Sequence, residues 1–324
     1  MRSIKKFQCP ICSSNGDLIY ENLKDNLFFC TNENFGINKC KNSSCGSLWV
    51  NPCIIDEDLI YAYKNYYTHG ENRKGIIFNI FKKSYHYIKT SFLAFWISKK
   101  ERLESDYMNL WDDIPGKILD IGCGDGKFLK RMQTLGWNCY GLDFDSKAVS
   151  ETCKNQGISA EVGGIEKLGN EYSEFDVITM SHLIEHVPNP IKFMAECRKH
   201  LKEGGKLVIR TPNTSSYGHD KFKNHWRGLE VPRHIQIFNR LSLETAAKEA
   251  GFKSNTFFTS ITGAEGILVA SYMLKKYGKF ENKFDSFTKR MEAIIFGVMY
   301  SIIAAKKLNE NPYSGEELYG ILRK

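Results

Sequence analysis

Residues 117–126 read Lys-Ile-Leu-Asp-Ile-Gly-Cys-Gly-Asp-Gly, and this stretch decides the fold. Its first half is a short apolar run that indicates a buried strand, and three glycines spaced Gly-x-Gly-x-Gly follow it. Glycines there let the backbone approach a ligand closely where a side chain would clash. A second apolar run ends at Asp143, whose carboxylate can accept both hydroxyls of a ribose. Together the two features predict a site for a nucleoside-containing cofactor.

Strand-like and helical runs alternate along the chain after residue 116. The strand-like runs cover residues 117–121, 138–143, 158–162, 175–180, 206–210 and 252–259, and the helical runs cover 126–135, 146–156, 190–203 and 243–250. Asn189 followed by Pro190 predicts a capped helix start. This alternation predicts an α/β fold with a doubly wound, mostly parallel sheet, in which ligands bind beyond the carboxyl ends of the central strands.

Three details of the glycine loop favour a methyl donor over a dinucleotide. The glycine spacing differs from Gly-x-Gly-x-x-Gly, no lysine is placed as in a phosphate-binding loop, and Asp120 precedes the glycines. A carboxylate there would repel a pyrophosphate, whereas it complements the ammonium and sulfonium groups of S-adenosylmethionine. S-adenosylmethionine is therefore the predicted cofactor.

The ten cysteines are distributed unevenly, with six of them in the first 53 residues. Short spacing between paired cysteines in a cytosolic chain is typical of zinc ligands. Gly46, after the last of the paired cysteines, allows the tight turn that such a site needs. Cys30 or Cys53 could replace one of the four ligands. The predicted structural Zn²⁺ site consists of four thiolates, those of Cys9, Cys12, Cys40 and Cys45.

Composition and charge limit which partners and which cellular location are expected for this chain. The chain has 42% hydrophobic residues and a net charge of +8, which suits an anionic partner such as nucleic acid, a phosphorylated substrate or an acidic membrane surface. It has no secretory signal, and its apolar run at residues 293–305 is too short to span a bilayer, so a cytoplasmic location is expected. Residues 77–100 predict a basic amphipathic helix, which either packs on the catalytic domain or touches the inner face of the membrane.

The motifs resemble, in their order, the Rossmann-like class I methyltransferases. They are KILDIGCGDGKFL, YGLDFD, FDVITMSHLIEHVPNP, LKEGGKLVIRTPN and HWRGLEVPRHIQIFNRLSL. The preceding CPIC and CKNSSCGSLWVNP resemble a bacterial group with an N-terminal zinc-ribbon-like segment, often linked to glycan modification. The class usually closes its sheet with an antiparallel hairpin, whose second strand is not visible after residue 260; residues 267–277 and 287–306 predict helices instead.

The predicted organisation has four parts. Residues 1–55 form a zinc-ribbon-like module, 56–112 a helical linker, 113–260 the methyltransferase domain and 261–324 a C-terminal helical extension. The resemblance also implies which residues bind the cofactor. They are Asp120, Gly122, Cys123 and Gly124 around the methionine and ribose, Asp143 and Phe144 at the ribose and adenine, Ile165 and Glu166 beside the adenine, and Ser181 and His182 near the sulfonium.

Methyl transfer to a hydroxyl requires alignment of the acceptor and removal of a proton, for which histidine is the natural base. His234 is the predicted base or substrate anchor, with His186 second. An alternative is that His182, Glu185 and His186 bind a catalytic metal.

Three residues before or beside His234 are predicted to bind the acceptor. Trp226 would stack on a sugar, and Arg227 and Arg233 would grip a phosphate or carboxylate. The predicted function is thus O-methylation of a sugar, glycan or other small-molecule hydroxyl, on an acceptor that is anionic or lipid-linked.

Two other functions stay open. One is an RNA methyltransferase whose zinc module binds nucleic acid, although the residues after the fourth strand lack the Asn/Asp-Pro-Pro-aromatic run used for exocyclic amines, so nucleic acid ranks below a small molecule. The other is a non-catalytic membrane-peripheral scaffold, which the intact Asp120, glycine loop and Asp143 disfavour.

Overall fold

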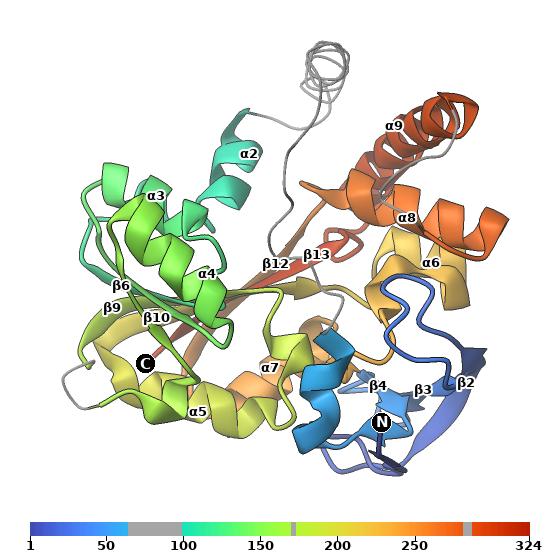
Figure 1. Cartoon of the computed structure of the whole chain (residues 1–324), viewed down its shortest axis with the longest axis horizontal. Helices are drawn as coiled ribbons and strands as arrows, with labels where there is room; N and C mark the ends of the chain where they lie inside the picture. Colours follow the sequence, from blue (N-terminus) through green and yellow to red (C-terminus); the bar gives the residue numbers. More distant parts are fainter. Residues whose placement is uncertain (64–98, 170–172, 281–286) are drawn as a thin grey trace.

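The computed structural model describes residues 1–63, 99–169, 173–280 and 287–324. Within them, a large central sheet with helices on both faces lies beside a smaller N-terminal sheet (Figure 1). Most of the basic helix expected at residues 77–100 falls outside the described residues. The linker region begins with a 3-10 helix, η1 (Asp56–Tyr63), and ends near α2 (Lys99–Asp106). Among the described helices, none is long and apolar enough to cross a membrane.

Among the described residues, the central sheet has seven strands in the order β8-β7-β6-β9-β10-β13-β12. The first five of these are parallel, and β13 is antiparallel to both of its neighbours, which confirms the predicted doubly wound, mostly parallel sheet. The strands are β6 (Lys117–Ile121), β7 (Asn138–Asp143), β8 (Ser159–Val162), β9 (Phe175–Ser181), β10 (Leu201–Pro212), β12 (Ser254–Ser260) and β13 (Glu317–Arg323).

Alternating side chains along the strands build a core on each face of this sheet. Ile118 packs with Leu129 and Met132 of α3 (Lys127–Thr134), whereas its neighbour Leu119 belongs to the core that contains Met194. Helices α3 and α4 (Ser146–Glu151) lie on one side of the sheet, and α5 (Pro190–His200) and α7 (Arg240–Glu249) on the other (Figure 1). The predicted cap of α5 is confirmed, because Asn189 accepts from the amide of Lys192.

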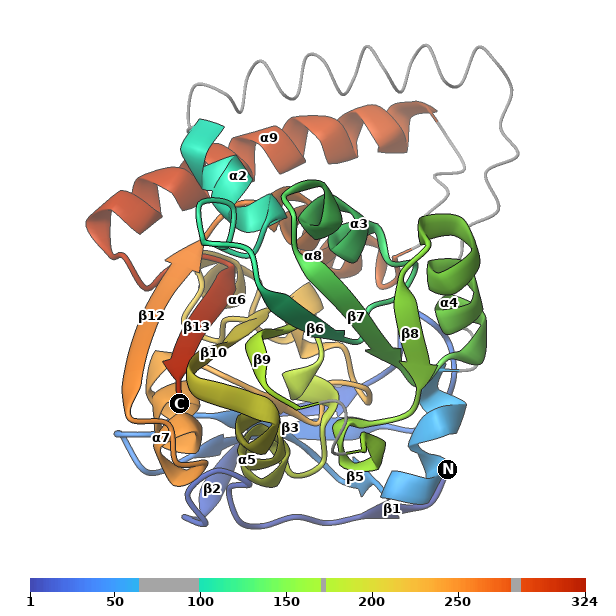
Figure 2. The ribbon, with the colours of Figure 1, turned by 90° about the vertical axis from the view of Figure 1, so that its left-hand side faces the viewer.

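The C-terminal region contains the predicted helices, α8 (Ala264–Tyr277) and α9 (Phe287–Glu310), and then a strand that the sequence analysis did not predict. That strand, β13, inserts between β10 and β12, with Val208 opposite Ile321 and Phe257 opposite Gly320 (Figure 2). It is the second strand of the closing antiparallel pair. The expected domain boundary at residue 260 is therefore corrected, since residues 317–323 belong to the central sheet.

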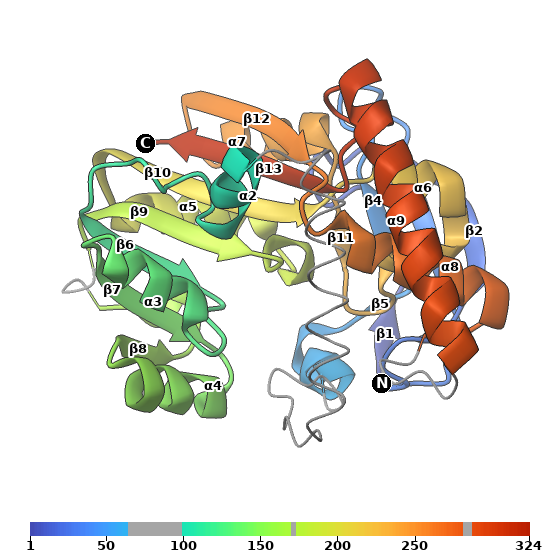
Figure 3. The same cartoon turned by 90° about the horizontal axis from the view of Figure 1, so that it is seen from above.

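The N-terminal region is built on β2 (Gly16–Leu23), β3 (Phe35–Cys40) and β4 (Leu48–Asn51), with the short pair β1 (Ser3–Ile4) and β5 (Cys53–Ile54) beside it. Its sheet continues into β11 (Gln236–Ile237), where Trp49 pairs with Gln236 (Figure 3). Phe35, Trp226 and Leu268 share one apolar core. The N-terminal module is thus joined to the chain after β10 by both a sheet and a core.

Candidate functional site

The glycine loop joins β6 to α3 in a conformation that only glycine adopts readily. Gly122, Gly124 and Gly126 have φ values of +77°, +55° and +71°. A Cβ at Gly126 would lie 2.7 Å from Cγ2 of Thr152, whereas none of the described atoms lies within 4 Å of where a Cβ of Gly124 would be. Open space therefore lies next to Gly124, where the backbone of the loop can approach a ligand.

Asp143 at the end of β7 lies against this loop. Its Oδ2 accepts from the amide of Gly124 at 2.9 Å and its Oδ1 from the amide of Asp145 at 2.9 Å. Each carboxylate oxygen can accept a further hydrogen bond, so the carboxylate is oriented and still able to hold ribose hydroxyls. Phe144, the next residue, is 66% exposed and offers an apolar surface to an adenine. These contacts fit a nucleoside with its ribose at Asp143.

The other residues predicted around the nucleoside have different placements. Cys123 is buried, and its Sγ lies against Gly141, so its side chain points away from the open space and into the sheet. Ile165 in the 3-10 helix η3 (Ile165–Lys167) is also buried, and Glu166 beside it is exposed.

Asp120 lies beneath the loop and is almost fully buried. Its Oδ1 accepts from the hydroxyl of Thr179 at 2.6 Å. Burial raises the pKa of Asp120 to about 7; the Thr179 hydrogen bond opposes this rise and the charge of Asp143 adds to it. Near neutral pH the carboxylate is therefore poised to ionise when a cation, such as an ammonium or sulfonium group, arrives.

Ser181 is the last residue of β9 and His182 follows it, beside the glycine loop. His182 has φ +53°, in the left-handed region, and Leu183 lies 3.6 Å from where a Cβ of Gly122 would be. His182 Nε2 lies 3.2 Å from Oε2 of Glu317, the first residue of β13, and its Nδ1 lies 3.5 Å from Oε1 of Glu185. Burial by itself would lower the pKa of His182, but these two carboxylates raise it to about 9.

Glu317 is a site residue that the sequence analysis missed. Its Oε2 also lies 3.2 Å from Nε of Arg210, which in turn donates to the hydroxyl of Ser181 at 3.0 Å. The signal that could have found it is the acidic pair Glu316-Glu317 directly before the apolar run at residues 318–322, which is typical of a short buried strand.

Glu185, His186 and His234 form a second cluster next to the end of β9. Glu185 and His186 lie in the 3-10 helix η4 (Ile184–His186), and His234 comes from the connection before β11. The two imidazole rings are 4.7 Å apart, and Nε2 of His234 lies 3.9 Å from Oε1 of Glu185. The structure thus brings together the two histidines predicted as catalytic and adds a buried carboxylate.

The charges in this cluster are set by burial and by its neighbours. Burial, with His186 nearby, lowers the pKa of His234 well below the ordinary histidine value. Burial by itself would raise the pKa of Glu185, but His182, His186 and His234 lower it to about 2. At neutral pH Glu185 is therefore an anion and His234 a neutral imidazole.

Arg233 does not face an open site, which corrects its predicted role in acceptor binding. Its side chain is fully buried, with Nη1 at 3.2 Å from Oδ2 of Asp25 and Nε at 3.1 Å from Oε1 of Glu230. The guanidinium also stacks on Phe28, with its central carbon 3.9 Å from the ring centroid. A cation buried between two carboxylates is an internal ion pair that joins the N-terminal module to the chain before His234.

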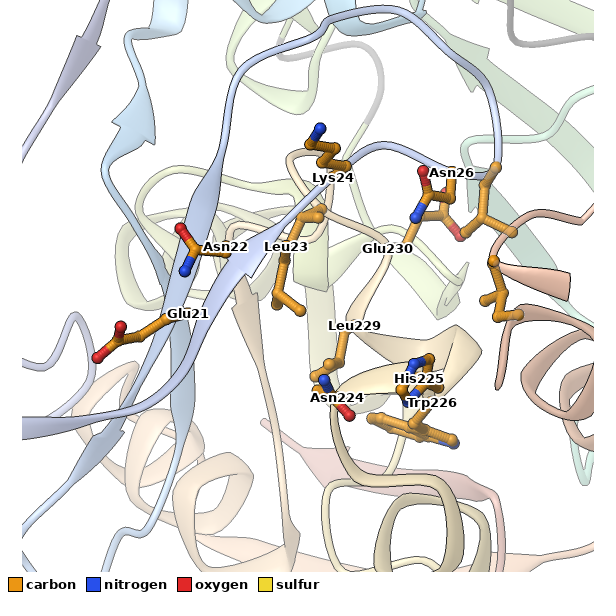
Figure 4. A pocket seen from close by; sticks show the side chains of 14 residues that line it. Glu21, Asn22, Leu23, Lys24, Asn26, Asn224, His225, Trp226, Leu229 and Glu230 are labelled. Carbon is orange, nitrogen blue, oxygen red and sulfur yellow. The ribbon is translucent and has the colours of Figure 1, made fainter. Parts of the chain in front are cut away.

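Trp226 lines a pocket between β2 and the 3-10 helices η5 (Lys223–His225) and η6 (Arg227–Leu229) (Figure 4), whereas Arg227 is not among the lining residues. Trp226 is only 1% exposed and its Nε1 donates to Oε2 of Glu316 at 3.2 Å, so it has no exposed ring face for a sugar, and that prediction is corrected. Arg227 is 28% exposed and paired with Glu230. Half of the residues that line the pocket are polar or charged, among them Asn22, Lys24, Asn26, Asn224 and Glu230.

The paired cysteines of the N-terminal module meet as predicted. The Sγ atoms of Cys9 and Cys45 are 3.8 Å apart and those of Cys12 and Cys40 are 3.4 Å apart, and the four sulfurs all lie within 4.8 Å of one another. Gly46 has φ +61°, which provides the predicted turn. Cys30 lies elsewhere, with its Sγ 3.9 Å from Arg233. The arrangement could hold a tetrahedral metal ion.

A family model described as a methyltransferase domain matches residues 94–255, which make up half of the chain. The chain belongs to this methyltransferase family. The glycine loop, Asp143 and both histidines of the Glu185 cluster lie inside the matched residues of the methyltransferase domain. The cysteine module and β13 lie outside them.

Several curated proteins are similar to part of this methyltransferase. A ubiquinone biosynthesis O-methyltransferase of Xanthomonas oryzae pv. oryzae is 32% identical over 116 residues, which are 33% of this chain and 48% of the relative. One of the same name from Maricaulis maris is 31% identical over 147 residues, 42% of this chain and 58% of the relative. The chain spans about half the length of the curated relatives it matches.

Solved structures are also similar to it. A SAM-dependent methyltransferase from Archaeoglobus fulgidus is 20% identical, with 77% of this chain and 100% of that chain covered and a TM-score of 0.45. A phosphoethanolamine N-methyltransferase 2 from Haemonchus contortus, in complex with S-adenosyl-L-methionine, is 14% identical, with 94% and 71% covered and a TM-score of 0.49.

Proposed function

We propose that the protein is an S-adenosylmethionine-dependent methyltransferase that methylates a hydroxyl of a sugar, glycan or other small molecule. The observation that carries the proposal is the glycine loop, with Asp143 bound to the amide of Gly124 and Asp120 buried beneath it. Relatives named as O-methyltransferases support an oxygen acceptor. The amide, ammonium and carboxylate groups that line the pocket between β2 and η5 support an acceptor with many hydroxyls.

The cofactor would be held by residues at the ends of three neighbouring strands. Asp143 would hold the ribose hydroxyls, Phe144 would cover the adenine, and Asp120 would balance the positive charge of the methionine end. Bound there, S-adenosylmethionine supplies a methyl carbon attached to a good leaving group. Ser181, the last residue of β9, and His182, directly after it, border the same region.

The chain itself must align the acceptor oxygen and accept its proton. If the cluster of Glu185, His186 and His234 holds no metal ion, Nε2 of His234 would take that proton, because Nδ1 of His234 already donates to the carbonyl of Gly228 at 2.7 Å. Glu185 Oε1, at 3.9 Å from Nε2, would stabilise the resulting imidazolium. His234→Ala is then expected to keep cofactor affinity and lose transfer, and unchanged turnover would remove His234 from the mechanism.

Incubation with cofactor carrying a labelled methyl group tests the function. The protein would be offered fractionated glycan intermediates, sugar nucleotides, small phenols and RNA, and cofactor binding would be measured separately by calorimetry. Label on a sugar or small-molecule oxygen is the expected result. Label on RNA would show that the acceptor is a nucleic acid instead of a small molecule. Absence of cofactor binding would refute the proposal that the protein is a methyltransferase enzyme.

We also propose that Cys9, Cys12, Cys40 and Cys45 hold a structural Zn²⁺. A closed set of four thiolates has no open position for chemistry, so the ion would stabilise the N-terminal module. Elemental analysis of the purified protein is expected to find about one equivalent of zinc. Cys12→Ser should lose it and Cys153→Ser, at an exposed cysteine outside the cluster, should keep it. A metal-free, fully folded wild-type protein would refute the proposal.

A further inference from the structure

The two histidines of the Glu185 cluster direct equivalent nitrogens toward the same space. Nδ1 of His186 donates to the carbonyl of Arg233 at 3.0 Å, and Nδ1 of His234 donates to the carbonyl of Gly228 at 2.7 Å. A carbonyl can only accept, so each Nδ1 carries the hydrogen and each Nε2 carries a lone pair. One ligand atom from each of Glu185, His186 and His234 lies within 4.8 Å of the others.

Glu185 completes this set. It is fully buried, and its Oε2 accepts from the hydroxyl of Thr211 at 2.9 Å. Within the part of the chain that the structure describes, its Oε1 accepts no hydrogen bond of good geometry. The nearest imidazole N–H group on its own side, Nδ1 of His182, lies 3.5 Å from this oxygen. A buried, oriented carboxylate oxygen without a well-formed hydrogen bond, beside two imidazole lone pairs, indicates that something else binds there.

We propose that Glu185, His186 and His234 bind a divalent transition-metal ion. Two imidazoles and one carboxylate favour ions such as Mn²⁺, Co²⁺ or Zn²⁺ over Mg²⁺ and Ca²⁺, which prefer oxygen ligands. The 3.9 Å between Nε2 of His234 and Oε1 of Glu185 can accommodate an ion about 2.1 Å from each.

The surroundings of the three ligands are those of a built metal site. In metalloproteins, a ligating imidazole commonly donates its other N–H to a carbonyl, and a ligating carboxylate is itself hydrogen-bonded. Both features are present here, at the Arg233 and Gly228 carbonyls and at Thr211. His182 lies outside this ligand set, because its Nε2 faces Glu317. The structure therefore favours His234 over His182 as the third ligand.

The role of the ion rests on the proposed function, whereas its binding does not. Glu185 and His186 follow the last residue of β9 by four and five residues, next to the segment that borders the proposed methionine end. A divalent cation lowers the pKa of a hydroxyl that coordinates it, so the acceptor would lose its proton to solvent at neutral pH. His234 would then act as a ligand, and its role as a base would apply only to the metal-free cluster.

Manganese binding tests the inference, because Mn²⁺ prefers nitrogen and oxygen ligands and discriminates against the thiolates of the cysteine cluster. The full-length, zinc-replete protein would be titrated with Mn²⁺ and followed by electron paramagnetic resonance and calorimetry. We expect about one equivalent bound. Glu185→Gln and His186→Asn should weaken binding at least tenfold, and His225→Gln, a histidine of η5 outside the cluster, should bind as wild type does.

Folding of each variant would be checked by circular dichroism. If a variant unfolds, paramagnetic shifts of the His186 and His234 imidazole resonances on adding Co²⁺ to the wild type provide the second readout. Absence of Mn²⁺ and Co²⁺ binding in the wild type, or binding by Glu185→Gln equal to wild type, overturns the site. Full transfer by protein stripped of metal overturns its role. Failure of the wild type to bind S-adenosylmethionine overturns the proposed function and leaves the metal result standing.

Discussion

Asp120 links cofactor binding to pH at the scale of a single residue. Its pKa of about 7 means that the folded protein holds a proton that the unfolded chain has already released above about pH 4. The stability that Asp120 contributes is therefore fully present below about pH 4 and is lost as the pH rises through about 7. A bound cation would favour the ionised form and release this proton.

We predict that affinity for S-adenosylmethionine rises about tenfold between about pH 5.5 and about pH 7, where the ligand's own α-amino group stays protonated. Calorimetry at both pH values measures it. The groups that face Asp120 are Thr179, Asp143, Arg210 and Arg131, and Asp143 is the one whose charge reinforces the shift. Asp120→Asn should bind more weakly at about pH 7 and show a flat profile; a tenfold rise in that variant would assign the effect to another group.

Gly124 offers a test of the cofactor loop with a matched control. Gly124→Ala should cost about 1–2 kcal/mol in folding because φ is +55°, and its methyl group would also enter the open space beside the loop. Gly157→Ala, at φ +64° and equally without a described atom within 4 Å of the added Cβ, should cost the same in folding. Calorimetry should find cofactor affinity reduced at least about tenfold in the first variant and unchanged in the second. Equal cofactor affinities of the two variants would contradict cofactor binding next to Gly124.

The cofactor residues could be predicted from the sequence more fully than the acceptor residues, for a physical reason. Asp120, Gly124 and Asp143 act through short segments that follow strands, so a local pattern determines where they lie. Arg233 pairs with Asp25, which lies more than two hundred residues earlier in the chain. No local sequence pattern shows that this carboxylate will form an ion pair with the guanidinium. Trp226 was misjudged in the same way, since Glu316 is its distant partner.

At the scale of elements, β6 and β7 match the predicted ranges because each is a short apolar run with helical sequence after it. Strand β13 escaped prediction because α8 and α9 separate it from its neighbour β12. It is also buried on both faces, so its residues show no alternation of apolar and polar side chains.

The position of β13 inside the sheet predicts a large effect of truncation there. Leu318 is completely buried between β10 and β12, so Leu318→Ala should lower the free energy of unfolding by about 2–5 kcal/mol in urea titrations. Leu241→Ala, at a 36% exposed leucine in α7, should change it by about 0.5 kcal/mol or less. Similar losses in the two variants would contradict an interior position for β13.

At the scale of the molecule, Arg233 with Asp25 and Glu230 fastens the N-terminal module to the connection that carries His234. Asp25→Asn should destabilise the protein by about 3–5 kcal/mol, because it leaves a buried guanidinium with one carboxylate fewer. Asp17→Asn removes an exposed ion pair with Lys41 in the same module and should cost about 1 kcal/mol or less. Urea denaturation compares the free energies of unfolding of the two variants. Equal small losses would mean that the buried ion pair does not hold the N-terminal module to the rest of the protein.

The interior position of β13 also constrains the order of folding. The chain forms contacts such as that of Arg210 with Tyr319 only after closing a loop of more than one hundred residues, and such contacts form slowly. Before that step, β10 has an open edge that can pair with other chains. Pulse-labelled hydrogen exchange during refolding is expected to protect the amides of β6 and β9 before those of β13. Because Glu317 arrives with β13, an incompletely folded molecule would hold the glycine loop and lack the carboxylate that pairs with His182, so the end of the cofactor site beside His182 would be completed last.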